Sequence, residues 1–265
     1  RELARPIEEA GHEFVYWPEK TTDSSELARR SAGADVVMIA NNPYPAEVVR
    51  GADALKMIAV AFTGIDHVGL DAARERGVTV CNCAGYSDVS VAELAVGLAI
   101  DVLRHVVPAD AATRAGGTSA GLMGREISGK TAGIEFASLD ELLAESDIVS
   151  LHLPLTPETR GFFDAEKIAR MKDGAVLVNC ARGPIVDNDA LAAALNEGKL
   201  AGAGIDVFDM EPPLPQGYAL ASAKNCVLTP HVAYLTEEAM ERRAVIEFGN
   251  VLAWLEGTPK NVCAL

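Results

Sequence analysis

Features that point to membrane, disulfide-bonded or nucleic-acid-binding proteins are missing from this chain of 265 residues. No apolar run reaches the roughly 18 residues of a membrane span, so we expect no membrane partner. The five cysteines are odd in number and form no CxxC pair, which argues against a disulfide framework. No signal peptide is recognisable, so a reducing cytoplasm is the expected location. Lysine and arginine number 23 against 38 acidic residues, and the formal net charge of −15 argues against nucleic acid as a partner.

What is present is an ordinary composition for a soluble globular protein, with 49% apolar and 23% charged residues. The length allows one large domain or two modest ones. Because the chain is acidic overall, any site for an anionic ligand must be basic locally. No metal site is expected, since Cys81 and Cys83 could form only half of one and no second cluster accompanies them.

The stretch 175–215 has the pattern of a βαβ unit in a parallel sheet. An apolar run over 175–178 predicts one strand, and a run over 203–208 predicts another. Between them, a helical pattern begins after the capping residue Asp187 and ends at Gly198. Ligands of such sheets bind just beyond the carboxyl ends of the strands, so functional side chains are expected there.

Four charged or titratable side chains stand at predicted strand ends. Arg182 follows the first strand, and Asp206 and Glu211 lie at and after the second. His231 follows a further strand-like run over 226–229. Taken singly, an Arg-Gly pair after a strand is usually a turn, and a Pro-His pair is usually part of a loop. Their joint occurrence at neighbouring strand ends favours a single site.

This set of groups suits the oxidation of a 2-hydroxy acid. A guanidinium can hold the carboxylate or the C2 oxygen of such a substrate with two parallel hydrogen bonds. An imidazole can take the hydroxyl proton as hydride leaves C2, and can return it in the reverse direction. A carboxylate beside the imidazole orients it and stabilises its charged form.

Three sequence motifs then indicate a family resemblance: NCARGPIVD (179–187), GIDVFDMEPP (204–213) and TPHVAY (229–234). They resemble the NAD-dependent D-isomer-specific 2-hydroxyacid dehydrogenases, the family that includes phosphoglycerate dehydrogenase, and the similarity runs from about Ala34 to the end of the chain. The resemblance implies hydride transfer between NAD(H) and C2 of a D-2-hydroxy acid or 2-keto acid. NAD is the family default and NADP is not excluded, while the side group of the substrate stays open.

The resemblance also assigns roles to residues. It implies that Arg182 binds the substrate, that His231 is the acid/base, and that Glu211 pairs with His231. The loop after an earlier strand would hold the substrate carboxylate through its backbone at Thr63 and Gly64. The residues implied in cofactor binding are Val89, Ser90, His152, Pro154, Thr159, Cys180, Ala181, Arg182, Asp206 and His231, with Asp206 near the nicotinamide.

The expected architecture is α/β, with two doubly wound parallel-sheet domains and a cleft between them. A flavodoxin-like substrate domain would comprise residues 1–90 and 236–265, and would include a short strand over 13–17. A Rossmann-type NAD-binding domain would comprise 91–235. The helix predicted over 89–106 is too apolar for a surface helix, so we expect it to lie between domains or against a second subunit of a homodimer.

The glycine-rich phosphate loop of such a domain is absent. No GxGxxG occurs in the 265 residues, and Thr131 leads almost directly into the next helix, so the first βαβ portion is missing near 131–137. Either the molecule has residues that this sequence omits, or the segment is deleted and NAD cannot be held, or the protein is unrelated to dehydrogenases. The density of motifs downstream argues against the third interpretation. A true deletion should remove the central first strand and open two sheet edges, so an omission is favoured.

The sequence is also compatible with a function of another class. The chain could be a catalytically inactive binding or regulatory protein that uses the dehydrogenase fold without holding the cofactor. Capture of NADH would discriminate the two, because only the enzyme requires it.

Overall fold

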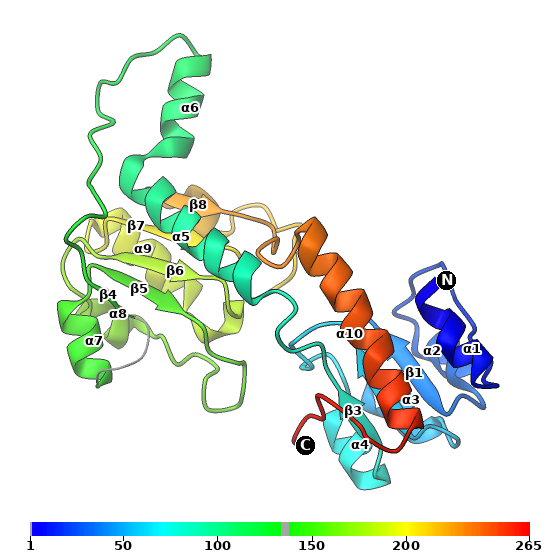
Figure 1. The fold of residues 1–265 in the computed structure, drawn as a ribbon. Helices are drawn as coiled ribbons and strands as arrows, with labels where there is room; N and C mark the ends of the chain where they lie inside the picture. The colour runs from blue at the N-terminus through cyan, green and yellow to red at the C-terminus, as the bar shows by residue number, and fades with distance from the viewer. Residues whose placement is uncertain (1, 134–137) are drawn as a thin grey trace. The chain divides into compact units, whose positions relative to one another are not determined.

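The computed structural model describes residues 2–133 and 138–265, and the chain divides into two compact units. Unit 1 comprises residues 1–88 and 235–265, and unit 2 comprises residues 89–234. These bounds lie close to the predicted domain boundaries. Each unit is built on a parallel sheet flanked by helices, which confirms the predicted α/β class (Figure 1).

Unit 1 contains a three-stranded parallel sheet in the order β1-β2-β3. The strands are β1 (Val36–Ile39), β2 (Met57–Val60) and β3 (Thr79–Cys81). The helices are η1 (Glu2–Ala4), α1 (Arg5–Glu9), α2 (Ser24–Ser31), α3 (Ala46–Gly51), α4 (Leu70–Arg76) and α10 (Glu237–Leu255).

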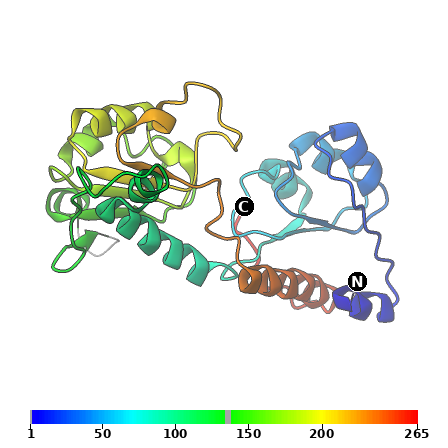
Figure 2. The ribbon, with the colours of Figure 1, turned by 90° about the horizontal axis from the view of Figure 1, so that it is seen from above.

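The central strand of unit 1 is buried on both faces. Met57 and Ala59 belong to one hydrophobic cluster with Val251 of α10, whereas Ile58 and Val60 belong to another cluster with residues of α3 and α4. Successive side chains of a strand point to opposite faces, so each cluster covers one face of the sheet. Helix α10 lies against η1 and β2 (Figure 2).

The strand predicted over 13–17 is wrong, because these residues are irregular and belong to neither sheet. The aromatic side chains of Phe14 and Trp17 contact helices instead, while Tyr16 is 68% exposed. The Phe14 ring lies 5.6 Å from the ring of Phe248 on α10, and the guanidinium of Arg29 on α2 lies 4.9 Å from the centre of the Trp17 ring. This segment therefore contacts two helices rather than a neighbouring strand.

Unit 2 contains a five-stranded parallel sheet in the order β4-β5-β6-β7-β8. The strands are β4 (Ala132–Gly133), β5 (Ile148–Leu151), β6 (Val176–Asn179), β7 (Gly202–Ile205) and β8 (Cys226–Leu228). The helices are α5 (Asp88–Arg104), α6 (Val106–Arg114), α7 (Leu139–Glu145), α8 (Ala165–Arg170), η2 (Gly183–Ile185), α9 (Asn188–Glu197) and η3 (Ala219–Ser222).

The two faces of this sheet are covered by different helices. Leu98 and Val102 of α5 pack with Val176 and Val178 of β6 on one face, while Leu177 packs with residues of α8 and α9 on the other. Figure 1 shows α5 crossing the sheet on the side opposite α9. This is a doubly wound arrangement, as predicted.

Local signals explain the βαβ unit that the sequence predicts around β6, α9 and β7. The side chain of Asp187 accepts a hydrogen bond from the backbone N–H of Ala190 at 3.0 Å and caps the start of α9. Gly198 ends the helix in the left-handed conformation at φ 81°, which glycine adopts without strain. The predicted strands and helix are confirmed here.

The strand thought to be lost near 131–137 is partly present. Ala132 pairs with Ile148 and Gly133 with Val149, so β4 forms one edge of the sheet, next to β5. The expectation that a deletion would interrupt the sheet and open two edges inside it is therefore wrong, because the remaining strands pair continuously. Residues 134–137, where the glycine-rich segment was expected, lie outside the described residues.

Candidate functional site

The neighbouring strands β6, β7 and β8 of unit 2 end in register. Their carboxyl ends lie side by side, and this side of the sheet is called its carboxyl edge. Asn179 of β6 pairs with Ile205 of β7, and Leu228 of β8 also pairs with Ile205. Because the strands are parallel, the segments that follow them leave the sheet at the same edge. These segments carry the predicted site residues Arg182, Asp206, Glu211 and His231.

His231 and Glu211 form a hydrogen-bonded pair. Oε1 and Oε2 of Glu211 lie 2.9 and 3.3 Å from Nδ1 of His231. An ionised carboxylate only accepts hydrogen bonds, so Nδ1 carries the proton and Nε2 is the nitrogen that can exchange a proton with a ligand. The ring also packs edge-to-face on Tyr234, with 5.5 Å between ring centres. The imidazole is thus held in one orientation while 29% of its side chain stays exposed.

Asp206 fixes the loop that presents His231. Its carboxylate is fully buried and accepts hydrogen bonds from the hydroxyl of Thr229 at 2.6 Å and from the backbone N–H groups of Val232 and Ala233, both at 2.9 Å. Its carbonyl oxygen accepts from the N–H of His231 at 2.8 Å. His231 has a left-handed backbone at φ 56°, which is unfavourable for a residue with a side chain. The bonds to Asp206 compensate this cost. The predicted place of Asp206 beside the nicotinamide stays a prediction.

Arg182 is presented by a turn that is held by β6 on one side and by the segment after β7 on the other. The buried side chain of Asn179 donates to the carbonyl of Arg182 at 3.1 Å and accepts from the N–H of Ala181 at 3.0 Å. The guanidinium donates to the carbonyl of Ala181 at 2.8 Å. A Cβ at Gly183 would lie 1.7 Å from the carbonyl oxygen of Phe208, so only glycine fits this contact. The turn that carries Arg182 is therefore anchored to the segment after β7.

Sequence reasoning missed residues that shape this edge: Asn179, Gly183 and Thr229. A polar residue that ends an apolar strand, such as Asn179, was a usable signal, because a buried amide needs partners. The role of Gly183 depends on a contact with a residue far along the chain, which sequence spacing does not reveal.

Cys180 belongs to the same edge but is not a reactive thiol. It is buried, and burial together with the negative charge of Asp206 raises the pKa of its thiol to about 12. A thiol with this pKa stays protonated near neutral pH and is a poor nucleophile. Cys180 and Ala181 therefore contribute shape and backbone groups to the turn.

Three of the residues implied in cofactor binding, His152, Pro154 and Thr159, share one loop after β5. The hydroxyl of Thr159 donates to the carbonyl of Pro154 at 2.7 Å and accepts from the N–H of Thr156 at 2.7 Å. Nε2 of His152 lies 2.8 Å from the hydroxyl of Ser150. Because β5 pairs with β6, this loop leaves the sheet at the same edge as the Arg182 turn. Their contact with a cofactor stays a prediction.

The other predicted residues lie elsewhere. Val89 and Ser90 are at the start of α5 in unit 2, where Val89 is 60% exposed and Ser90 is buried. Thr63 and Gly64 belong to unit 1, in the loop that follows β2. Unit 2 thus brings together the proposed acid/base group and the substrate-binding guanidinium, and unit 1 carries the proposed carboxylate-binding loop.

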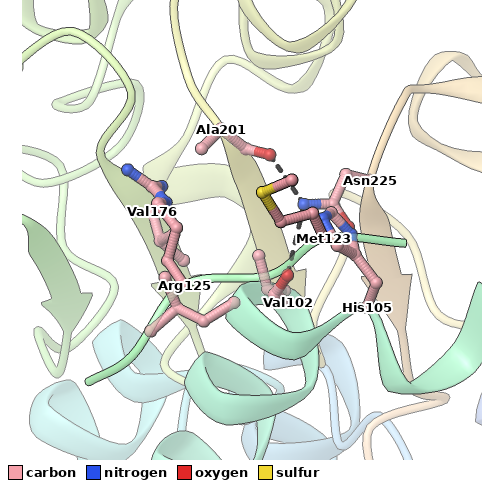
Figure 3. Close-up of a pocket in the computed structure, with 8 residues that line it drawn as sticks. Val102, His105, Met123, Arg125, Val176, Ala201 and Asn225 are labelled. Carbon is pink, nitrogen blue, oxygen red and sulfur yellow. Dashed lines mark hydrogen bonds between the residues drawn. The ribbon is translucent and has the colours of Figure 1, made fainter. Parts of the chain in front are cut away.

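Two cavities lie near the ends of the unit 2 strands. One, of about 160 Å³, is at the amino ends of β6 to β8, where Asn225 donates to the carbonyls of Ala201 at 2.7 Å and Val102 at 3.3 Å (Figure 3). This cavity therefore lies at the opposite end of the strands from His231. The other, of about 150 Å³, is at the carboxyl edge and is lined mostly by apolar residues: Phe208, Pro212, Leu214, Leu228, Thr229 and Pro230. Its lining residues Pro212 and Pro230 are the chain neighbours of Glu211 and His231.

Among residues 2–133 and 138–265, no group of three or more His, Cys, Asp or Glu side chains could hold a metal ion. Over the same ranges, no helix is both long enough and apolar enough to cross a membrane.

Comparison with protein families gives one match to part of the chain. Residues 130–233 match the model described as "D-isomer specific 2-hydroxyacid dehydrogenase, NAD binding domain". The match covers the strands and loops that carry Arg182, Asp206, Glu211 and His231.

Individual relatives match almost the whole chain. A glycerate dehydrogenase from Methylorubrum extorquens is 35% identical over 301 aligned positions, which cover 99% of this chain and 94% of the relative. A glyoxylate reductase from Thermofilum pendens is 36% identical, with 93% of this chain and 85% of the relative covered. The 301 aligned positions exceed the 265 residues of the chain, so the relative has residues without a counterpart here.

The solved structure of another dehydrogenase is also similar to this chain. The NAD-dependent formate dehydrogenase from Staphylococcus aureus in complex with NAD matches with a TM-score of 0.87 and 28% identity, over 100% of this chain and 92% of that chain. These named proteins are enzymes, so they do not support the alternative of a catalytically inactive binding protein.

Proposed function

Because the chain belongs to the D-isomer specific 2-hydroxyacid dehydrogenase family, we propose that it transfers a hydride reversibly between C2 of a small D-2-hydroxy acid and NAD. The observation that carries this proposal is the His231–Glu211 pair, which stands at the same sheet edge as Arg182. An acid/base group and an anion-binding guanidinium are the two protein functions that this reaction needs.

The steps assigned to the chain concern binding and one proton. The guanidinium of Arg182 holds the substrate through its carboxylate or its C2 oxygen with paired hydrogen bonds. In oxidation, Nε2 of His231 takes the hydroxyl proton while Glu211 stabilises the resulting imidazolium through Nδ1. In reduction, the same nitrogen returns the proton to the C2 oxygen. The nicotinamide supplies or accepts the hydride at C2 when it is bound.

The residues of the chain fit the nicotinamide end of the dinucleotide. The donor set at the carboxyl edge combines an imidazole, a guanidinium and the backbone groups of the Arg182 turn. The sequence contains no GxGxxG, so we assign no residue to the pyrophosphate. NAD is proposed as the cofactor, with NADP as the alternative.

The substrate class follows from the site and the relatives together. The relatives named for glyoxylate and glycerate act on small acids, and Arg182 supplies the local positive charge that an acidic protein needs for such anions. We propose that Thr63 and Gly64 bind the carboxylate through backbone N–H groups. Residues Val89, Ser90, His152, Pro154, Thr159, Cys180, Ala181, Arg182, Asp206 and His231 are proposed to contact the cofactor.

The test is reduction of keto acids by NADH. Glyoxylate, hydroxypyruvate, pyruvate and phosphohydroxypyruvate would be compared by following the loss of NADH absorbance, and NADH binding would be titrated separately by fluorescence. We expect turnover of at least one keto acid and its loss in His231→Asn, a replacement that tolerates the left-handed backbone. NADH binding without turnover of any of the four acids would contradict the proposed reaction, and absence of NADH binding at millimolar concentration would contradict the cofactor.

We propose in addition that the protein is a homodimer. Helix α5 exposes Val96 and Ile100, which are 56% and 39% accessible, and α6 exposes Val107 at 53%. In the segment after α6, Met123 is 91% exposed. Exposed apolar side chains on successive segments of one unit are typical of a protein–protein interface. Light scattering should give the dimer mass for the wild type and a lower mass for Val96→Glu, whereas a monomeric wild type would contradict this proposal.

A cytoplasmic location is proposed from the cysteines. All five lie in the described part of the chain and are free thiols. Burial raises the pKa of Cys83 and of Cys226 to about 12, so these thiols are suited to a reducing compartment rather than to disulfide formation. Recovery of the protein in a secreted or membrane fraction of its own cell would contradict this location.

A further inference from the structure

Three asparagines of unit 1 form a closed ring of hydrogen bonds. The side-chain amide of Asn250 donates to the carbonyl of Asn82 at 2.7 Å, and its side-chain oxygen accepts from the amide of Asn261 at 2.8 Å. The ring closes where the backbone N–H of Asn82 donates to the carbonyl of Asn261 at 3.1 Å. Asn82 follows β3, Asn250 is in α10, and Asn261 is in the segment after α10.

The ring is buried at its centre, and the side-chain amide groups of all three asparagines donate hydrogen bonds. Asn250 is 2% exposed. Asn82 also accepts from the N–H of Ala84 through its side-chain oxygen at 3.2 Å. Asn261 has a left-handed backbone at φ 51°, which asparagine tolerates better than most residues. An apolar residue at 250 would remove the buried amide from the ring and leave the carbonyl of Asn82 and the side-chain amide of Asn261 without their partner at 250, which is costly.

The ring is joined by a hydrogen bond to the loop that carries Thr63 and Gly64. The side-chain amide of Asn82 donates to the carbonyl of Thr63 at 2.8 Å, and the N–H of Cys83 donates to the carbonyl of Phe62 at 3.0 Å. Two successive carbonyls of the loop are therefore turned toward the segment after β3.

The direction of these carbonyls determines the direction of the next N–H groups. In a trans peptide the C=O of one residue and the N–H of the next lie in the peptide plane and point in opposite directions. The cis peptide among the described residues is Pro212–Pro213, so the peptides after Phe62 and Thr63 are trans. The N–H groups of Thr63 and Gly64 consequently point away from Asn82 and Cys83. Adjacent N–H groups pointing to one side are suited to an anion.

We propose that the ring of Asn82, Asn250 and Asn261 positions the N–H groups of Thr63 and Gly64 for the carboxylate of the substrate. The inference rests on the proposed function, because that function assigns the carboxylate to this loop. Asn250 and Asn261 are positioning residues that act through Asn82, and neither needs to contact the substrate. The ring also makes substrate affinity depend on α10 and on the segment that follows it.

A positioning role predicts a split between kinetic constants. Hydrogen bonds to the substrate carboxylate are present in the bound substrate and in the transition state alike, so weakening them raises KM and leaves kcat nearly unchanged. A residue that only stabilises unit 1 would lower the fraction of folded enzyme instead. That loss would reduce the apparent kcat and leave KM as it is.

The experiment uses the full chain and compares three variants. Asn250→Leu keeps the size of the side chain and removes its polar groups. Asn261→Gly removes the donor to Asn250 and keeps the left-handed backbone, so it serves if Asn250→Leu does not fold. Val251→Ala is the control, because it is the next residue of α10 and is equally buried, at 3% exposure, but lies outside the ring.

Three measurements decide the outcome. We expect both asparagine variants to raise KM for the keto acid about tenfold or more, with kcat changed by less than about threefold and NADH affinity unchanged. Hydrogen–deuterium exchange of the unliganded protein should become faster over 61–66 in these variants and not in Val251→Ala. Asparagine variants that match Val251→Ala in KM and in exchange over 61–66 would overturn the inference. If the wild type reduces no keto acid, the proposed function fails, and the exchange data still decide whether the ring holds the loop.

Discussion

Nδ1 of His231 lies 2.9 Å from Oε1 of Glu211, although the two residues are separated by the whole of β8 and the loop before it. The pair depends on the left-handed backbone of His231, and that backbone depends on the bonds its loop makes to buried Asp206. Two sets of contacts therefore orient the imidazole. The ring bonds to Glu211, and the backbone of His231 is held by the bonds that its loop makes to Asp206.

Replacement of His231 by asparagine should lower kcat by about 10²- to 10⁴-fold, the range that general acid–base catalysis contributes. Glu211→Gln should lower kcat less, because glutamine can still accept from Nδ1 but cannot stabilise the charged imidazole. Steady-state NADH oxidation measures both effects. Circular dichroism should show the wild-type fold in each, and a Glu211→Gln variant with the same loss as His231→Asn would contradict the assigned roles.

Changing Arg182 to lysine should raise KM for the keto acid and lower kcat. One ammonium point charge cannot reproduce the two parallel hydrogen bonds of a guanidinium. NADH titration by fluorescence serves as the control and should be little changed. An Arg182→Lys variant with wild-type KM would show that the substrate does not need this guanidinium.

Gly183→Ala should destabilise unit 2 and displace Arg182. The added Cβ would lie 1.7 Å from the carbonyl oxygen of Phe208, so the turn must move. Overpacking of this kind typically costs about 1–3 kcal/mol of the free energy of unfolding. Gly97→Ala in α5 is the matched control, because nothing lies within 4 Å of its added Cβ. Alanine is the better helix former, so this control should keep or raise stability. Thermal unfolding and kcat would be measured for both, and equal behaviour of the two variants would contradict the close contact.

Glu247 of α10 should make the stability of unit 1 depend on pH. Burial raises the pKa of its carboxyl to about 7, although the Arg243 guanidinium opposes the shift. Between the ordinary pKa of 4.5 and about 7 the folded state holds a proton that the unfolded state has lost, so stability from this group falls as pH rises through that range. Glu247→Gln should remove this slope and raise Tm relative to the wild type at pH 8 but not at pH 4. Parallel slopes for the two proteins between pH 5 and pH 7 would contradict the raised pKa.

Much of the candidate site at the carboxyl edge of the unit 2 sheet could be predicted from local patterns. The strand β6, the cap Asp187 and the terminating Gly198 are each encoded within a few residues of where they act. Position beyond a strand end then suffices to place Arg182 and His231 at one edge, because parallel strands of a doubly wound sheet end together.

Other features could not be read in this way. The segment expected to be a strand over 13–17 pairs with no strand; its Phe14 and Trp17 contact α10 and α2 instead. Among the described residues β4 comprises Ala132 and Gly133, and its place at the sheet edge follows from pairing with β5 rather than from its own composition.

By itself the sequence determined the α/β class, the order of strands and helices around β6 to β8, and the chemical groups carried by their ends. These depend on periodicity and capping, which act between residues close along the chain. Only the tertiary structure decided that Gly183 touches Phe208, that Asp206 holds the His231 loop, and that asparagines at 82, 250 and 261 close a ring. Such contacts form between distant segments, and their distances exist only once the packed core has brought those segments together.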